Sequence, residues 1–307
     1  MGVWIDTDMG FDDIAAIMVV DHAGLVIDGV SLVFGNATLA HVCANAASAI
    51  AAFGWQFPVH TGKAAPVSGH AQTAQNILGE TGIPSLGARL PAAADLKQSD
   101  AIEALSDWLA NAPGPHRILA LGPLTNIAAL IQARPDLVAR IDELVWMGGG
   151  VTRGNHTASA EFNAYADPEA LAIVLAQNLN FKMVDLDLCR QVLLTPDDTD
   201  AIRAAGGAKA TLLADLLGGY IDIAISRGRA AMAVYDPSAA VAFVRPDLVT
   251  FAPARIDAEC AGTFTRGRTV VETRSSHGVF NAEYAVEIDV DAARNLILGA
   301  VLAEAQK

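Results

Sequence analysis

Cysteine is scarce in this chain of 307 residues, which contains only Cys43, Cys189 and Cys260. They are far apart and form no CxxC spacing, and an odd number cannot close into a complete set of disulfides. A reducing compartment such as the cytoplasm is therefore expected. Basic residues are also few, with 20 Lys and Arg against 34 Asp and Glu and a net charge of −14. Because nucleic-acid-binding proteins neutralise phosphates with clustered cations, this balance argues against a nucleic-acid partner.

Long hydrophobic runs are absent as well, although 52% of the residues are hydrophobic. No stretch reaches the roughly 20 apolar residues that a membrane-spanning helix needs. The N-terminus lacks the basic and apolar regions of a signal peptide. We therefore expect no membrane partner and a large buried core. The length permits a single domain over residues 1–307.

Apolar runs alternate with Ala-rich segments, a pattern typical of βαβ units. The alternation predicts an α/β fold of one domain, Rossmann-like, with a mostly parallel central sheet flanked by helices. Strands are expected at residues 3–6, 25–34, 116–121, 144–147 and 181–184. Helices are expected to begin near Asp12, Thr38, Asp100, Leu124 and Pro168.

Other parts of the chain depart from this alternation. Residues 58–91 are rich in Gly, Pro, Thr and Gln, which favours a surface loop near one end of the sheet, suitable for covering a site. After Thr195 the pattern predicts helices, followed by an antiparallel pair of strands at 269–273 and 284–289. A last helix is expected over 292–305.

The most informative segment is DTDMGFDD at residues 6–13, where four carboxylates lie within eight residues directly after an apolar strand. Such charges repel one another unless a cation lies between them. Oxygen ligands at the carboxyl end of a strand suit Ca²⁺ or Mg²⁺. Alternatively, Asp12 and Asp13 serve the N-terminus of the following helix. That alternative leaves Asp8 unexplained, and the two interpretations are compatible.

Polar groups also follow other predicted strands, at the same edge of the sheet. Asn36 follows the second strand and could bind a sugar hydroxyl, and the carbonyl of Leu121 ends the third and could bind calcium. Each is equally typical of an ordinary turn or helix cap. Asp236, between Tyr235 and Pro237, is either a helix cap or a further carboxylate directed toward the first cluster.

The fourth strand ends at Met147 and is followed by three glycines, which allow close approach of backbone to a ligand. Polar side chains suited to sugar hydroxyls come next, namely Asn155, Glu161 and Asn163. Phe162 would supply an apolar wall. A solvated surface loop is the alternative interpretation of this stretch.

Taken together and in this order, the segments resemble the inosine-uridine nucleoside hydrolase family, and the resemblance covers nearly the whole chain. It implies hydrolysis of ribonucleosides to free base and ribose, with Asp8 as general base. Ca²⁺ would be held by Asp8, Asp13, Asp236 and the carbonyl of Leu121. The ribose would be bound by Asp12, Asn36, Met147, Asn155, Glu161 and Asn163. A homodimer or homotetramer is also implied.

Two positions depart from the family pattern. Members active on inosine and uridine carry histidines where this chain has Leu78 and Tyr235. An aromatic residue at Tyr235 is similar to the purine-preferring relatives, so a purine preference and a catalytic contact of Tyr235 with the leaving base are expected. By stacking or by its hydroxyl, Tyr235 could act on the base. Arg227, Arg229 and His70 are further candidates for contact with the base.

Two other classes of function remain open on the sequence. An Asp-x-Asp after the first strand also begins the Mg²⁺-dependent haloacid-dehalogenase phosphatases, although Gly10 and the Asp12-Asp13 pair do not fit their pattern. A non-catalytic protein that binds nucleosides or sugars would use the same polar loop. The absence of histidine at positions 78 and 235 favours this alternative, because such a site could still bind ribose without activating the leaving base.

Overall fold

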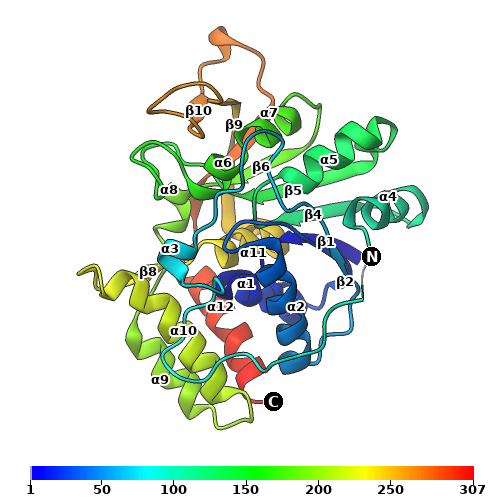
Figure 1. Ribbon diagram of the computed structural model, residues 1–307. Coiled ribbons are helices and arrows are strands. Elements are labelled where there is room, and N and C mark those ends of the chain that lie inside the picture. Colours follow the sequence, from blue (N-terminus) through cyan, green and yellow to red (C-terminus); the bar gives the residue numbers. More distant parts are fainter. Residues whose placement is uncertain (1, 98) are drawn as a thin grey trace.

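The computed structural model describes residues 2–97 and 99–307 and is built on a nine-stranded sheet. The strand order is β10-β9-β11-β6-β5-β4-β1-β2-β3 (Figure 1). All neighbours from β11 to β3 are parallel, and only β9 pairs antiparallel, with β10 and β11. The strands are β1 (Gly2–Thr7), β2 (Val26–Leu32), β3 (Val59–Thr61), β4 (His116–Ala120), β5 (Ile141–Met147), β6 (Phe181–Val184), β9 (Val249–Ala258), β10 (Thr269–Glu272) and β11 (Ala282–Ile288). The predicted α/β fold is confirmed.

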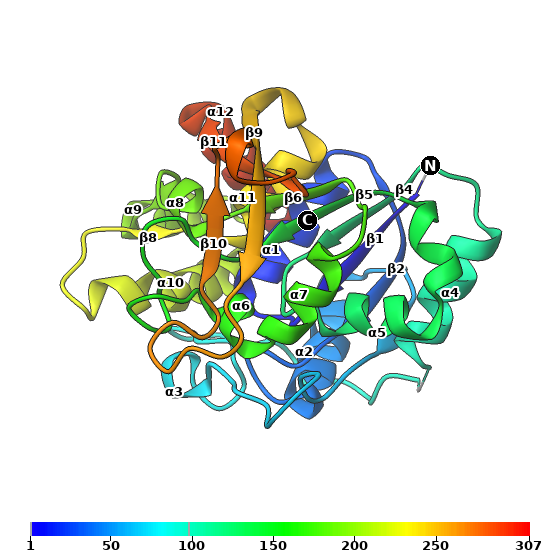
Figure 2. The same ribbon diagram turned by 90° about the horizontal axis from the view of Figure 1, so that it is seen from above.

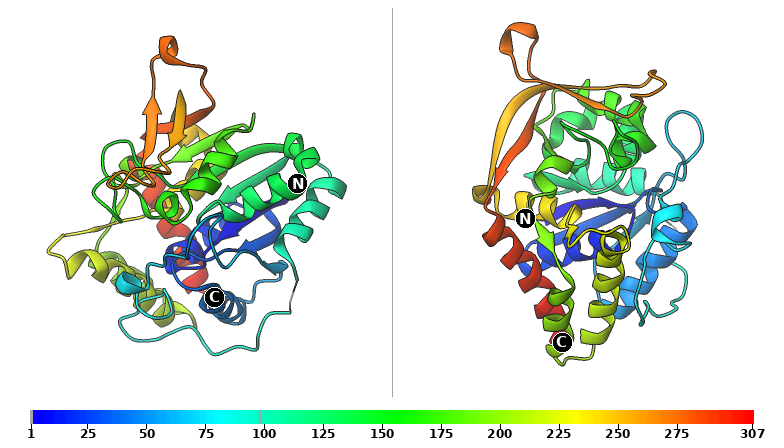
Figure 3. Two further views of the ribbon diagram at one scale, coloured as in Figure 1. Left: turned by 45° about the horizontal axis from the view of Figure 1, so that its top comes forward. Right: turned by 90° about the vertical axis from the view of Figure 1, so that its left-hand side faces the viewer.

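Helices cover both faces of the sheet, and each face has its own hydrophobic core (Figures 2 and 3). In β1, Val3 and Ile5 belong to one core and Trp4 to the other, as the two-residue period of a strand requires. The first core includes α1 (Phe11–His22), α2 (Leu39–Phe53), α9 (Pro196–Ala204), α10 (Ala210–Ile225), α11 (Asp236–Val244) and α12 (Val290–Ala305). The second includes α4 (Ala101–Asn111), α5 (Thr125–Ala133), η1 (Pro135–Arg140) and α7 (Pro168–Leu175).

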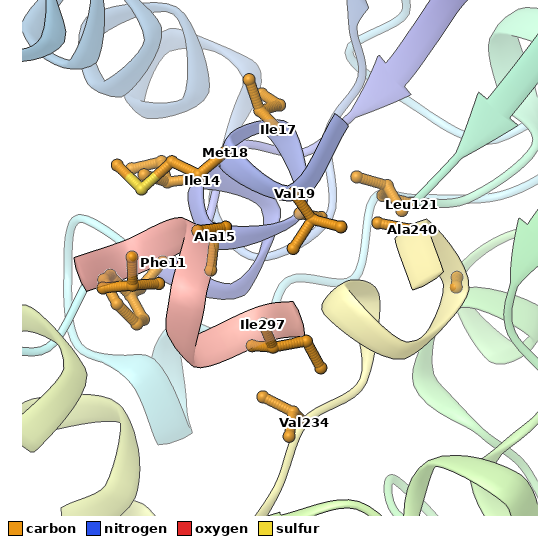
Figure 4. Close-up of a cluster of buried hydrophobic side chains, with 14 of the residues drawn as sticks. Phe11, Ile14, Ala15, Ile17, Met18, Val19, Leu121, Val234, Ala240 and Ile297 are labelled. Carbon is orange, nitrogen blue, oxygen red and sulfur yellow. The ribbon is translucent and has the colours of Figure 1, made fainter. Parts of the chain in front are cut away.

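Helix α1 is buried over most of its surface because it lies among other helices as well as against the sheet. Nearly every residue from Phe11 to Val20 is buried, which is typical of an interior helix. Figure 4 shows α1 side chains directed toward Ala240 of α11 and Ile297 of α12. This packing holds the N-terminus of α1 in place at the carboxyl end of β1.

One sequence prediction about strands is wrong, and one strand of the sheet was not predicted. The expected antiparallel pair at 269–273 and 284–289 does not exist, because β9 lies between β10 and β11 and pairs with both. The sequence of β9 contains Pro253, which normally argues against a strand inside a sheet. Pro253 lies outside the part of β9 that pairs with β10, so on that side it has no partner strand.

The segment 58–91 also contains more regular structure than expected. It begins with the edge strand β3 and includes the short helix α3 (Gln75–Leu78). The remaining short elements are α6 (Phe162–Ala166), α8 (Leu186–Cys189), the small sheet of β7 (Leu193–Leu194) and β8 (Met232–Ala233), η2 (Pro246–Leu248) and η3 (Ser275–His277). Among the described helices, none has the length and apolar character to cross a membrane.

Candidate active site

The loop between β1 and α1 brings the N-terminal aspartates together through an unusual backbone conformation. Met9 has a φ of 47°, in the left-handed region that side-chain-bearing residues seldom adopt. Its backbone N–H donates to Thr7 Oγ1 at 3.0 Å, and Thr7 Oγ1 in turn donates to Asp13 Oδ1. Gly10 N donates to Asp13 Oδ2 at 2.8 Å. Asp13 therefore does cap α1, as the alternative interpretation of the motif required.

The loop does more than cap α1, because the carboxylate of Asp236, from far along the chain, lies beside its aspartates. Oxygens of Asp12, Asp13 and Asp236 all lie within 4.8 Å of one another. Asp236 is the first residue of α11, with Pro237 directly after it, and α11 packs against α1. Asp8 lies beside the group: Asn36 Nδ2 is 2.7 Å from Asp8 Oδ1 and 3.2 Å from Asp13 Oδ2.

The electrostatics of these four aspartates favour a bound cation. Burial, reinforced by the neighbouring carboxylates, raises the pKa of Asp8 and of Asp236 well above the usual range and that of Asp12 to about 7. Burial also raises the pKa of Asp13. Within the described ranges, none of the four forms an ion pair with Lys or Arg. Buried carboxylates without a positive partner are the donor set that a hard divalent cation needs.

The cluster opens into a cavity of about 540 Å³, a volume in the range of small-molecule sites. Of the residues predicted for the site, all but Asp13 line it: Asp8, Asp12, Asn36, Leu121, Met147, Asn155, Glu161, Phe162, Asn163, Tyr235 and Asp236. Asp13 is fully buried behind this wall. Leu78, Arg227 and Arg229 also line the cavity, whereas His70 is exposed and does not.

The segment around α6 is held by a dense set of hydrogen bonds. Glu161 caps α6, with Oε1 accepting from Asn163 N at 2.8 Å and Oε2 from Ala164 N at 3.0 Å. Gly149 N also donates to Oε2 at 2.8 Å. Burial raises the pKa of Glu161 to about 7. This buried carboxyl group is thus fixed by backbone donors from α6 and from the glycine loop that follows β5.

Asn163 connects the ends of two strands. Its Nδ2 lies 2.8 Å from the carbonyl oxygen of Leu121 and 3.0 Å from that of Met147. The carbonyl of Leu121 therefore faces the cavity and has one polar partner. Nearby, Asn155 Oδ1 accepts from Phe162 N at 3.0 Å, and Phe162 packs on Val33 and Phe34. The amide groups and the aromatic wall predicted from sequence lie on one side of the cavity.

Among the cavity residues that the sequence did not indicate, Tyr220 and Arg190 carry polar groups next to predicted site residues. The hydroxyl of Tyr220, in α10, lies 3.3 Å from Asp12 Oδ2 and 3.0 Å from the carbonyl oxygen of Ala233. Arg190, which follows α8, lines the cavity next to the loop that carries Asn155. Neither residue stands in a polar motif after a predicted strand, which is the signal that identified the others.

Comparisons with known proteins agree with this fold. The sequence profile described as "Inosine-uridine preferring nucleoside hydrolase" matches residues 3–295. The non-specific ribonucleoside hydrolase RihC of Salmonella paratyphi B is 33% identical over 299 residues, which is 95% of each chain. A purine-preferring ribonucleoside hydrolase from Gardnerella vaginalis has a TM-score of 0.90 at 26% identity, covering 100% of this chain and 99% of its own. A plant nucleoside hydrolase has a TM-score of 0.90 at 25% identity, and the match covers 98% of this chain and 99% of the plant chain.

The fold and the comparisons define a hydrolase of the N-glycosidase class, built on an α/β fold. The chain belongs to the inosine-uridine preferring nucleoside hydrolase family. The resemblance inferred from the motifs is confirmed, and the phosphatase alternative is rejected.

Proposed function

We propose that this protein hydrolyses the N-glycosidic bond of ribonucleosides to a free base and ribose, in a calcium-dependent reaction with some preference for purines. The observation that carries the proposal is the cluster of four aspartates at the cavity, none of which is paired with Lys or Arg in the described ranges, together with the hydrogen-bonded amides of the cavity wall. The first group suits a metal ion and the second suits sugar hydroxyls.

Asp8, Asp13, Asp236 and the carbonyl of Leu121 would hold the Ca²⁺. They are hard oxygen donors, and calcium accepts the irregular coordination that such a mixed set provides. When bound, the ion would lower the pKa of a coordinated water and neutralise the repulsion among the carboxylates. This ligand set fits the raised pKa of Asp8, Asp13 and Asp236, which burial causes in all three and neighbouring carboxylates reinforce in Asp8 and Asp236.

The ribose would lie between the aspartates and α6. Asp12, Asn36, Asn155, Glu161 and Asn163 present acceptors and donors that match the hydroxyl groups of the sugar. Met147 and Phe162 supply apolar contact. Because these groups are fixed by hydrogen bonds to the backbone or to one another, little reorganisation is needed when the sugar binds.

In the reaction, a water oxygen attacks C1′ while the bond from C1′ to the base nitrogen breaks, and the electron pair of that bond leaves with the base. Asp8 accepts the proton of the water as general base. The sugar passes through an oxocarbenium-like state, as in other glycoside hydrolyses. The carboxylates of Asp12 and Glu161 and the amide oxygens would stabilise the positive charge on the ring.

Tyr235 would contact the base, either by stacking or through its hydroxyl. It lines the cavity next to Asp236, and its predicted role fits a purine, whose two fused rings offer the larger stacking surface. The relative from Gardnerella vaginalis with a similar fold is purine-preferring, which supports the same preference here.

Cellular context and assembly are also part of the proposal. All three cysteines are free, which fits a reducing cytoplasm. A single domain and a homodimer or homotetramer are proposed from the family resemblance. Sedimentation of the purified protein would measure the assembly.

The decisive experiment is release of reducing sugar from inosine, adenosine, guanosine, uridine and cytidine, with and without a calcium chelator. We expect ribose release that the chelator abolishes and added calcium restores, with faster turnover of purines. Turnover that is indifferent to the chelator would reject the metal site. Nucleoside binding without any release would instead favour the non-catalytic binding protein.

A further inference from the structure

Arginine is concentrated at the cavity although the chain as a whole is strongly acidic. Four arginines line it, namely Arg153, Arg190, Arg227 and Arg229, and no lysine does. The net charge of the chain is −14, so positive charge gathered at one cavity calls for a specific explanation. In the proposed function the aspartates hold the metal and the residues around α6 bind the ribose. The four arginine side chains have no role in either.

Arg190 is held in place by three hydrogen bonds. Its Nη2 donates to the carbonyl oxygen of Gly154 at 2.9 Å, and its Nη1 lies 3.2 Å from both the carbonyl of Arg153 and Asp187 Oδ1. A guanidinium has five N–H donors. Two of them therefore have no partner among the described residues and are free to bind a ligand.

Arg229 is less constrained and carries an unneutralised charge. It is exposed and follows the C-terminal end of α10, where its backbone N–H donates to Ala224 at 3.0 Å. Within residues 2–97 and 99–307 its guanidinium forms no ion pair. An arginine at the rim of a cavity without an acidic partner can direct its full charge toward a ligand.

Both arginines line the cavity together with Tyr235. Arg190 directly follows Cys189, whose Sγ lies 3.6 Å from the carbonyl oxygen of Tyr235. Arg229 lies in the turn that joins α10 to β8, the strand that leads to Tyr235. Burial raises the pKa of the Tyr235 phenol, and the charges of Arg190 and Arg229 act in the opposite direction.

We propose that Arg190 and Arg229 stabilise the departing base as an anion. The inference rests on the proposed function. Guanidinium groups bind delocalised anions through planar, charge-assisted hydrogen bonds, and a base that carries carbonyl oxygens spreads its charge over them. Bases of the oxo-purine and oxo-pyrimidine class are therefore the favoured leaving groups.

The step balances without a further reactant. The C1′–N bond breaks, its electron pair remains on the base nitrogen, and the base leaves as an anion paired with the guanidinium groups. The water oxygen forms the new bond to C1′ and loses its proton to Asp8. After release the base takes up a proton from solvent, and the Asp8 proton returns to solvent.

The test compares two substrates that share ribose but differ in how much help the leaving group needs. Inosine requires stabilisation of its base, whereas p-nitrophenyl β-D-ribofuranoside releases a phenolate that is stable by itself. We expect Arg229→Gln to lower kcat/KM for inosine about 100- to 1,000-fold, the loss typical of removing one donor to a developing charge. The p-nitrophenyl substrate should lose much less, and Arg229→Lys should recover part of the loss on inosine because it keeps the charge.

Arg190→Lys should show the same selective loss on inosine, since it keeps the charge but not the planar pair of donors. Arg153→Gln is the matched control, because it removes an equal charge from the same cavity at the segment that carries Asn155, which is assigned to the ribose. This control should change both substrates by the same factor. Equal losses on the two substrates in Arg229→Gln, or no loss, would overturn the inference alone. A wild-type protein that cleaves neither substrate would overturn the proposed function and this inference with it.

Discussion

Asn36 holds the carboxylate of Asp8 from two directions, although 28 residues separate them in sequence. Its backbone N–H lies 2.6 Å from Asp8 Oδ2, and its side-chain Nδ2 lies 2.7 Å from Asp8 Oδ1. The same Nδ2 is 3.2 Å from Asp13 Oδ2. One amide therefore orients two carboxylates that would otherwise repel each other.

Replacing this amide should damage the site in a way that depends on charge. Asn36→Asp removes the Nδ2 donor and adds a carboxylate to the cluster, so we expect kcat/KM for nucleosides to fall more than 100-fold, or by roughly 3 kcal/mol. Asn36→Ala removes the donor without adding charge and should cost less. Initial rates and calcium titrations of both variants measure the difference. Equal losses in the two variants would mean that charge repulsion has no part in the effect.

Asp8 is the proposed general base, and its removal should nearly abolish turnover. Asp8→Ala and the isosteric Asp8→Asn should both lower kcat by at least about 100-fold, because neither side chain can accept the proton of the attacking water. Calcium affinity should be measured in parallel, since Asp8 is also a proposed ligand. Wild-type kcat in Asp8→Asn would exclude Asp8 as the base.

Tyr235 can act through its ring or through its hydroxyl, and two substitutions separate these roles. Tyr235→Phe keeps the ring and should retain most of the activity on purine nucleosides if stacking dominates. Tyr235→Ala removes both and should lose about 10-fold in kcat/KM, in line with the energy of an aromatic stacking contact. Rates on inosine and guanosine supply the measurement. If both variants match wild type, Tyr235 does not contribute to departure of the base.

Asp185 provides a test of stability against pH outside the metal cluster. It caps α8, with Oδ1 accepting from Asp187 N and Leu188 N, while its buried Oδ2 has no hydrogen-bond partner. Burial raises the pKa of Asp185 to about 6. In the unfolded chain the carboxyl of Asp185 loses its proton at a lower pH than in the folded protein. The contribution of protonated Asp185 to the free energy of unfolding is therefore complete below about pH 4 and is lost as the pH rises through about 6.

Asp185→Asn should keep the cap and remove this dependence. Relative to the variant, the wild type should lose up to about 3 kcal/mol of unfolding free energy as the pH rises from 4 to above 6. Urea unfolding of both proteins across this pH range, with chelator present in every sample, measures the change. Parallel pH profiles for the two proteins would contradict the raised pKa.

Much of the fold could be predicted because the signals are local. The runs that became β1, β4 and β6 are short, apolar and bounded by turn residues, and such runs form strands wherever a sheet can bury both faces. β9 escaped prediction because Pro253 and charged residues interrupt its pattern. Its strand conformation depends on pairing with β11 over Val249–Ala254 and with β10 over Arg255–Ala258.

The residue types of the site were also evident from sequence, since carboxylates and amides directly after apolar strands must gather at one edge of a parallel sheet. The sequence by itself determined the α/β class, the acidic loop and the polar segments that face the cavity. Tertiary structure decided that the carboxylate of Asp236 lies beside those of Asp12 and Asp13, that Tyr220 meets Asp12, and that Arg190 and Arg229 line one cavity with Tyr235. The physical reason is that these contacts arise from the packing of α10 and α11 on α1 through a shared hydrophobic core, and local sequence patterns do not encode such long-range packing.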